Sequence, residues 1–169
     1  ATAIVKTLTV NHHHVNWLVL NDDILQSLEE RSHNIKYLPW CYIDKEFITP
    51  SKDINEVVRD VDIVFLAMPS AFLTKFLEPL KESLADKIVV SAVKGIIPGD
   101  YLTIVEHMNR YDDVPMKNLV VVTGPSHAEE VGQCRLSYLT VASEDNSSAG
   151  RVKELLANDF FRCSISHDV

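Results

Sequence analysis

A predicted strand runs directly into a predicted helix in the segment Val120-Val121-Val122-Thr123-Gly124-Pro125-Ser126-His127-Ala128-Glu129-Glu130-Val131. Its β-branched first half predicts a buried strand, and the acidic second half, with apolar residues at Ala128 and Val131, predicts the first turns of a helix. Ser126 stands where an N-cap belongs and Glu129 follows three residues later, the spacing of a capping box. Such a strand-to-helix corner leaves backbone N–H groups that can hold a polar or anionic ligand, although a capped turn without a ligand explains the same residues.

The alternation of strand and helix continues along the chain. Apolar strands are predicted at 15–20, 61–68, 87–93, 118–123, 137–142 and 160–165. Helices are predicted at 1–11, 22–32, 53–60, 70–84, 98–110, 125–132 and 147–158. Residues 33–52 have no clear periodicity and are predicted to form a loop. This order is typical of a single α/β domain with a mostly parallel, doubly wound sheet flanked by helices on both faces.

Composition limits the class of protein. Hydrophobic residues make up 46% and charged residues 24% of the 169 residues, which indicates a globular domain and argues against disorder. The formal net charge of −8, without a basic stretch, argues against nucleic acid as the main partner. No apolar run approaches the roughly 18–20 residues that a membrane span needs. The N-terminus has no charged segment followed by an apolar one, so no signal peptide is predicted.

Cysteine and histidine patterns favour neither a metal site nor a disulfide scaffold. Cys41, Cys134 and Cys163 are far apart and form no C-x-x-C pair, which fits a reducing cytoplasm. His12-His13-His14 could suggest a metal site. Adjacent residues in a loop point in different directions, and no Cys, Asp or Glu lies at ligand spacing, so a solvated turn is the preferred interpretation.

Candidate site residues follow the predicted strands, because ligands of open α/β sheets bind beyond the carboxyl ends of the strands. These positions are Leu20-Asn21, Pro69-Ser70, Lys94-Gly95 and Gly124-Pro125-Ser126. The Lys94 ammonium can donate to a carbonyl, hydroxyl or phosphate oxygen, and Gly95 allows a tight turn beside a ligand. A lysine that merely reaches solvent at the rim of the sheet is the alternative. Pro69-Ser70 alone indicates a helix start rather than a site.

Two of these segments together resemble a known family. Ser91-Ala92-Val93-Lys94-Gly95, followed by Thr123-Gly124-Pro125-Ser126-His127-Ala128-Glu129-Glu130, is similar to the T-K-G and G-P-[ST]-x-A-x-E motifs of NAD(P)-dependent sn-glycerol-3-phosphate dehydrogenases. Val93 replaces the threonine of the first motif. Other segments lie at the spacing of the same family, so the resemblance covers the whole chain: Tyr37-Leu38-Pro39, Met68-Pro69-Ser70 and Ser166-His167-Asp168-Val169.

The resemblance implies a Rossmann-like cofactor domain that works with a helical C-terminal domain. Together they would interconvert dihydroxyacetone phosphate and sn-glycerol 3-phosphate with NAD or NADP. The resemblance further implies a cytoplasmic homodimer that supplies glycerol 3-phosphate for phospholipid synthesis. The substrate-binding residues would be Lys94, Gly124 and Ser126. The cofactor-binding residues would be Lys94, Ala128, Leu20, Asn21 and Pro69.

Three departures from the family pattern matter. The family's first strand and Gly-rich phosphate loop are missing, and Ala1-Thr2-Ala3 would be the tail of that motif. The helical domain after Val169, with the proton-donating lysine, is also missing, so no catalytic residue is assigned to this chain and the chain alone is expected to be inactive. Leu20 stands where many members carry Arg or His for the 2′-phosphate of NADP, although Asn21 could still bond to a ribose hydroxyl.

Two alternative functions remain open at this point. One is another two-domain dehydrogenase of the ketopantoate or opine type, which substrate screening would separate. The other is a non-catalytic nucleotide-binding or interaction module. In that case Lys94→Ala would leave ligand affinity intact, whereas the dehydrogenase hypothesis predicts a loss of turnover.

Overall fold

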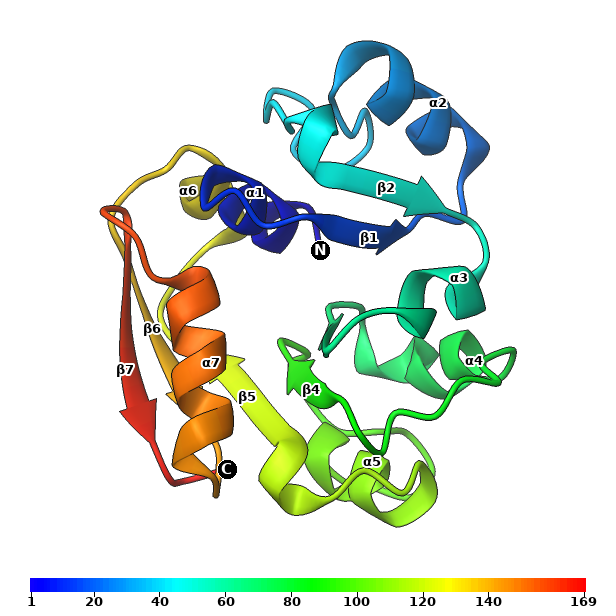
Figure 1. Ribbon diagram of the computed structural model, residues 1–169, viewed down its shortest axis with the longest axis vertical. Coiled ribbons are helices and arrows are strands. Elements are labelled where there is room, and N and C mark those ends of the chain that lie inside the picture. The colour runs from blue at the N-terminus through cyan, green and yellow to red at the C-terminus, as the bar shows by residue number, and fades with distance from the viewer.

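A computed structural model describes residues 1–169. The helices are α1 (Thr2–Val10), α2 (Asp22–Arg31), α3 (Ile54–Arg59), α4 (Leu73–Leu77), α5 (Ile104–Tyr111), α6 (Ala128–Gly132) and α7 (Asn146–Leu156). The strands are β1 (Val15–Leu18), β2 (Ile48–Ser51), β3 (Ile63–Leu66), β4 (Ile88–Ser91), β5 (Leu119–Thr123), β6 (Ser137–Ala142) and β7 (Phe161–Ser166) (Figure 1). Short 3₁₀ turns precede β2, α4 and β5.

The strands form two sheets. Five of them pair in the order β3-β4-β5-β6-β7, and only the β5–β6 pair is antiparallel. Strands β1 and β2 form a separate parallel pair. The expected α/β fold with a mostly parallel, doubly wound sheet is therefore confirmed.

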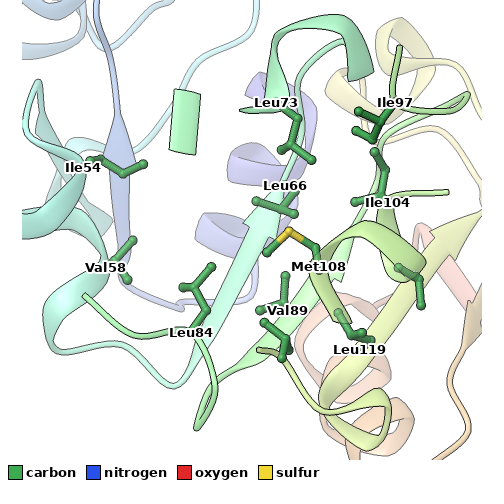
Figure 2. Close-up of a cluster of buried hydrophobic side chains, with 12 residues drawn as sticks. Ile54, Val58, Leu66, Leu73, Leu84, Val89, Ile97, Ile104, Met108 and Leu119 are labelled. Atoms are coloured by element: carbon green, nitrogen blue, oxygen red, sulfur yellow. The ribbon is translucent and has the colours of Figure 1, made fainter. Parts of the chain in front are cut away.

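Strand β4 is buried on both faces and separates two layers of helices. Val89 points into a cluster with Leu73 of α4 and Met108 of α5, which Figure 2 shows. Its neighbours Ile88 and Val90 point into the opposite cluster, which contains residues of α1 and α7. Because successive side chains of a strand point to opposite faces, one continuous apolar strand serves both layers.

The β1–β2 pair has a core of its own. Trp17 and Ile48 pack with Leu28 of α2 and Val5 of α1. The pair is tied to α3 by a hydrogen bond that the Asn16 side chain donates to the carbonyl of Val57, at 3.3 Å. Strand β1 pairs only with β2, and β3 pairs only with β4, so each presents one open edge.

The prediction of a loop over residues 33–52 is wrong at its end. Ile48–Ser51 forms β2, which pairs in parallel with β1. The strand is only four residues long and contains Pro50, which cannot donate a ladder hydrogen bond and is tolerated at the edge of a sheet. Its short length and its proline removed the alternating pattern by which strands are recognised.

Two predicted helices are shorter than expected. The one predicted over 70–84 is a 3₁₀ turn at Ser70–Phe72 followed by the five residues of α4, and Pro79 lies just beyond its end. The one predicted over 98–110 begins only at Ile104. Gly99 and Tyr101 have positive φ values of 102° and 58°, which a right-handed helix excludes.

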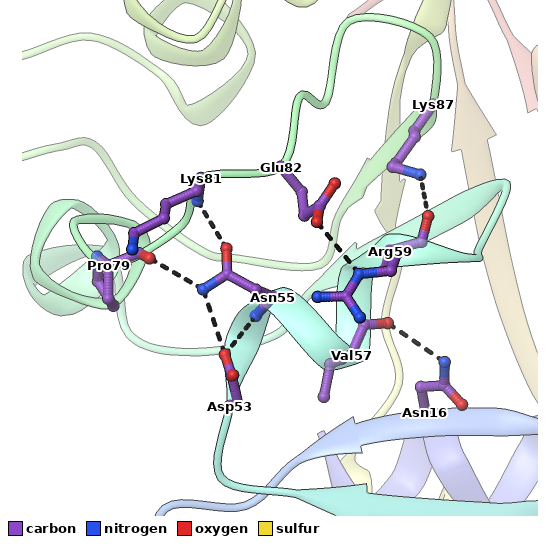
Figure 3. Close-up of polar contacts among 9 residues, drawn as sticks. All are labelled: Asn16, Asp53, Asn55, Val57, Arg59, Pro79, Lys81, Glu82 and Lys87. Atoms are coloured by element: carbon purple, nitrogen blue, oxygen red, sulfur yellow. Dashed lines mark hydrogen bonds and ion pairs between the residues drawn. The ribbon is translucent and has the colours of Figure 1, made fainter.

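Asn55 fastens α3 to the loop after α4 (Figure 3). Its side-chain amide donates to the carbonyl of Pro79 at 3.1 Å, and its carbonyl oxygen accepts from the backbone N–H of Lys81 at 2.7 Å. The same amide also donates to Asp53, the N-cap of α3. One side chain thus holds the loop that leads from α4 towards β4.

Asn55→Ala removes the donor and the acceptor together. We expect it to lower the free energy of unfolding by about 1 kcal/mol, the ordinary net value for such bonds near the surface. Asn55→Asp keeps the acceptor for Lys81 but loses the donor and adds a charge beside Asp53, so it should also destabilise. Urea denaturation followed by circular dichroism measures both changes. Equal stability of wild type and Asn55→Ala would contradict the role of this side chain.

A capping box begins α5. The Glu106 carboxylate accepts from the Thr103 backbone N–H at 2.8 Å and from its hydroxyl at 2.9 Å, and the Thr103 hydroxyl accepts from the Glu106 N–H. The bond from the Thr103 backbone, then that from its side chain, hold the pKa of Glu106 below its ordinary value of 4.5. A carboxylate with a lowered pKa in the folded state stabilises the fold above that value and loses the effect as the pH falls.

The stability difference between wild type and Glu106→Gln should therefore shrink as the pH is lowered from about 6 to about 3, since the wild type alone loses an ionised cap. Urea denaturation at several pH values measures this difference. Glu154→Gln is the control, because Glu154 is exposed on α7 and makes no hydrogen bond. A Glu106→Gln difference that stays constant across this range would contradict the prediction.

Candidate functional site

The topology marks one end of the sheet as the place for a ligand. From β1 the chain proceeds to β2 on one side, and from β3 it proceeds to β4 and β5 on the other. The two sheets are separate, but Val15 of β1 and Ile63 of β3 pack against one buried cluster, so the strand order of the two sheets taken together reverses between β1 and β3. In open α/β sheets, ligands bind at such a reversal, outside the carboxyl ends of the strands.

The segments that follow β3 and β4 meet at this edge. The backbone N–H of Ala92 donates to the carbonyl of Leu66 at 2.9 Å, and a Cβ atom on Gly95 would lie 3.5 Å from the hydroxyl oxygen of Ser70. Gly95 has a φ of +96°, a conformation that favours glycine. Lys94 is exposed and makes no hydrogen bond or ion pair within the chain. Its ammonium is thus free to bind a ligand.

Large apolar side chains are exposed at the same edge. Phe72 is 52% exposed after β3, Ile96 is 48% exposed after β4, and Leu20 is 53% exposed after β1. Pro69, also exposed, begins the 3₁₀ turn that carries Phe72. Exposed apolar side chains in the same loops as the Lys94 ammonium and the Ser70 hydroxyl suit a ligand that combines aromatic rings with phosphates, as a nicotinamide dinucleotide does.

Gly124 turns the chain at the end of β5. Its φ is +142°, and a Cβ atom there would lie 2.7 Å from the carbonyl oxygen of Tyr138 on β6. This glycine is therefore required by the close packing of β5 against β6. The N–H of Ser126 donates back to the Gly124 carbonyl at 2.9 Å, which closes a tight turn before the helix.

The capping box expected at Ser126 and Glu129 is wrong. Helix α6 begins at Ala128, and its N-cap is His127, whose side chain makes no capping bond. Ser126 lies one residue too early to cap, because the turn at Gly124 and Pro125 takes up an additional residue. The continuous β-branched run located the strand, but the exact start of the helix depended on this turn.

The remaining predicted residues lie around this edge. Asn21 caps α2 as expected, since its side-chain oxygen accepts from the Ile24 N–H at 3.0 Å. Ala128 is exposed at the start of α6, and α6 packs on α1. The structure thus brings Pro69 and Lys94 to adjoining loops and Gly124 to the next strand. Leu20 and Asn21 lie at the end of β1, in the other sheet.

Sequence reasoning missed Phe72 and Ile96 as surface for a ligand. Both were assigned to regular secondary structure or left unremarked, whereas both are exposed beside the site. The available signal was a large apolar residue within six positions of the end of a buried strand, in a segment that also contains proline or glycine.

Ring side chains with close neighbours also occur at His107 and at His12. His107 lies 2.8 Å from Asp100 through Nδ1. Burial alone would raise the pKa of Asp100, but hydrogen bonds from His107 and the Leu102 backbone hold that pKa below its ordinary value. Burial raises the pKa of Asp112. His12 packs against Phe47, and no group of three or more His, Cys, Asp or Glu side chains is arranged to hold a metal ion.

Comparison with known proteins identifies the family. The family described as NAD-dependent glycerol-3-phosphate dehydrogenase N-terminus matches residues 1–149. The chain belongs to this family. It is 31% identical to the glycerol-3-phosphate dehydrogenase [NAD(P)+] of Halalkalibacterium halodurans and 31% identical to that of Latilactobacillus sakei. The match covers 99% of this chain in both cases, and 49% and 51% of those proteins.

Solved structures of glycerol-3-phosphate dehydrogenases share the fold. The Plasmodium falciparum protein aligns with a TM-score of 0.88 at 18% identity, over 98% of this chain and 49% of that one. The Coxiella burnetii protein aligns with a TM-score of 0.85 at 22% identity, over 99% of this chain and 51% of that one. The chain therefore spans about half the length of its relatives. None of its helices is long and apolar enough to cross a membrane.

Gly124→Ala tests the corner that carries the second family motif. We expect a loss of about 1–3 kcal/mol in the free energy of unfolding, because the new methyl group would collide with the Tyr138 carbonyl at a strained φ. Gly99→Ala is the matched control, since Gly99 also has a positive φ but no atom lies within 4 Å of the new Cβ. Urea denaturation compares the two. A loss at Gly124 no larger than that at Gly99 would contradict this contact.

Proposed function

We propose that the complete protein containing this chain interconverts dihydroxyacetone phosphate and sn-glycerol 3-phosphate with a nicotinamide dinucleotide. The observation that carries the proposal is the unpaired ammonium of Lys94, exposed on the loop that adjoins Ser70 at the reversal of strand order. Family membership of residues 1–149 supports the same conclusion. The chain itself is the cofactor-binding part of that enzyme.

The open strand edges support a partial Rossmann-type domain over residues 1–169. Strands β1 and β3 each have one unpaired edge, yet Val15 of β1 and Ile63 of β3 pack against the same buried cluster. Unpaired edges of apolar strands favour the addition of another strand. We propose that the first strand of the complete domain lies between them and that its phosphate loop leads into α1.

The cofactor would lie along the carboxyl ends of β1, β3 and β4. Leu20 and Asn21 would contact its adenosine ribose, Pro69 and Lys94 its nicotinamide half, and Ala128 would pack nearby. A bound nicotinamide dinucleotide would supply the hydride. The apolar side chains at this edge would exclude water from the reacting carbons, and contact between those carbons is what hydride transfer requires.

The substrate would lie between Lys94 and the corner after β5. The Lys94 ammonium can donate to the ketone oxygen and stabilise the negative charge that develops there. Gly124 and Ser126 would form the opposite wall, with Gly124 allowing close approach of the backbone. The proton that the product needs would come from a lysine of the helical domain that the family resemblance implies.

Assembly and location follow the family expectation. We propose a homodimer in the cytoplasm that supplies glycerol 3-phosphate for phospholipid synthesis. The three cysteines, all free thiols, are consistent with a reducing compartment. Size-exclusion chromatography with light scattering on the complete protein tests the dimer directly.

Reduction of dihydroxyacetone phosphate by NADH or NADPH tests the proposed activity in the complete protein. Lys94→Ala should lower kcat/KM by about 10²-fold or more, because one preorganised donor is lost at the developing charge. Lys75→Ala is the control, since Lys75 is exposed on α4 and has no partner.

Several results would contradict the proposal. If the Lys94→Ala variant reduces dihydroxyacetone phosphate at the wild-type rate, Lys94 has no part in the reaction. Reduction of ketopantoate or of an imine formed from an amino acid and an oxo acid, with none of dihydroxyacetone phosphate, would assign the chain to another two-domain dehydrogenase.

A further inference from the structure

The carboxyl ends of β1 and β2 bring two polar segments together. Leu18 pairs with Ser51 in the parallel ladder, and the N–H of Val19 donates to the Ser51 carbonyl at 2.9 Å. The residues that follow β1 therefore lie beside those that follow β2, at the same end of the pair (Figure 1). This places the start of α2 next to Lys52.

Lys52 is bound to Asp22 across this end. Its ammonium lies 2.7 Å from the Asp22 carboxylate, and the two side chains are 50% and 79% exposed. Lys52 is the only basic residue within 19–25 and 50–58, where Asp22, Asp23, Asp53 and Glu56 are acidic. The single cation at this end of the sheet is thus already paired, and an excess of negative charge surrounds it.

Hydrogen bonds hold two of the other acidic side chains, Asp53 and Glu56. The backbone N–H of Asn55, then its side chain, hold the pKa of Asp53 below its ordinary value. The Glu56 carboxylate accepts a hydrogen bond from the Ser51 hydroxyl at 2.8 Å. Leu20 contributes no charge, and the Asn21 side chain keeps its amide N–H groups available because only its oxygen is used to cap α2.

This end of β1 is where doubly wound dinucleotide-binding folds meet the adenosine ribose. An acidic or amide group there suits a 2′-hydroxyl, whereas a 2′-phosphate needs an unpaired Arg or Lys. A phosphate dianion placed here would lie at an end of the sheet whose segments carry four acidic residues and one lysine that is already paired. We infer that this site selects NAD(H) over NADP(H), and that Asp22 sets the selection by holding Lys52 and by repelling the 2′-phosphate. The inference rests on the proposed function, because it assumes that a nicotinamide dinucleotide binds at this edge.

Fluorescence titration of the complete protein with NADH and with NADPH tests the inference without any turnover. At low ionic strength, NADH should bind about tenfold more tightly or better, because exposed charges act strongly there. Asp22→Asn should free Lys52, tighten NADPH binding several-fold and leave the Kd of NADH nearly unchanged. Lys52→Gln added to Asp22→Asn should remove the part of that gain that comes from the freed ammonium, and leave the part that comes from the lost repulsion.

Glu29→Gln is the matched control. It removes one negative charge from the exposed far end of α2, and neither Kd should change. Equal or tighter binding of NADPH by the wild type would overturn the inference. An Asp22→Asn variant that shifts both dissociation constants alike would overturn the role given to Asp22. Binding of neither dinucleotide would instead overturn the proposed function on which the inference rests.

Discussion

The burial of β4 on both faces is the constraint on which the rest of the structure depends. Val89 packs towards α4 and α5, while Ile88 and Val90 pack towards α1 and α7. Full burial of each such side chain contributes roughly 1.5–3 kcal/mol, and a strand buried on both sides needs a helix layer on each side. The chain must therefore pass from one strand to the next through a helix that packs on a face of the sheet. That requirement makes β3, β4 and β5 parallel and brings their carboxyl ends to one edge.

The position of the proposed ligand-binding edge follows from this geometry. Parallel strands deliver Pro69, Lys94 and Gly124 to the same end of the sheet, although they lie far apart in the sequence. The antiparallel β6 then packs so closely on β5 that only glycine fits at Gly124. On the other side, the β1–β2 pair carries its own core and its own charges, with Lys52 and Asp22 paired where the strands end. The proposed binding surface and the proposed selectivity thus come from separate parts of one fold.

Strands whose burial sets the pattern of apolar residues could be predicted from the sequence. Helix ends, which depend on turns, could not. The apolar runs located six strands, because burial imposes the run itself. Strand β2 was not predicted, because it is only four residues long and contains Pro50, and so has no recognisable apolar pattern. The helices after β3 and β4 were predicted too long, because local backbone features end or delay them. Pro79 follows the end of α4, and positive φ values at Gly99 and Tyr101 delay the start of α5. Lys94 was recognised as a candidate from its place after a strand, whereas the Lys52–Asp22 pair required the register of β1 with β2.

Hydrogen–deuterium exchange of the complete protein, with and without NADH, maps where the cofactor binds. We predict that NADH slows exchange in four segments that follow β1, β3, β4 and β5, namely 20–22, 67–72, 92–97 and 124–128. Backbone amides at the opposite end of these strands should be unaffected, because ligands of such sheets bind outside the carboxyl ends. Slower exchange only at the amino ends of the strands would contradict binding at the carboxyl ends. Unchanged exchange in these four segments at saturating NADH would contradict it as well.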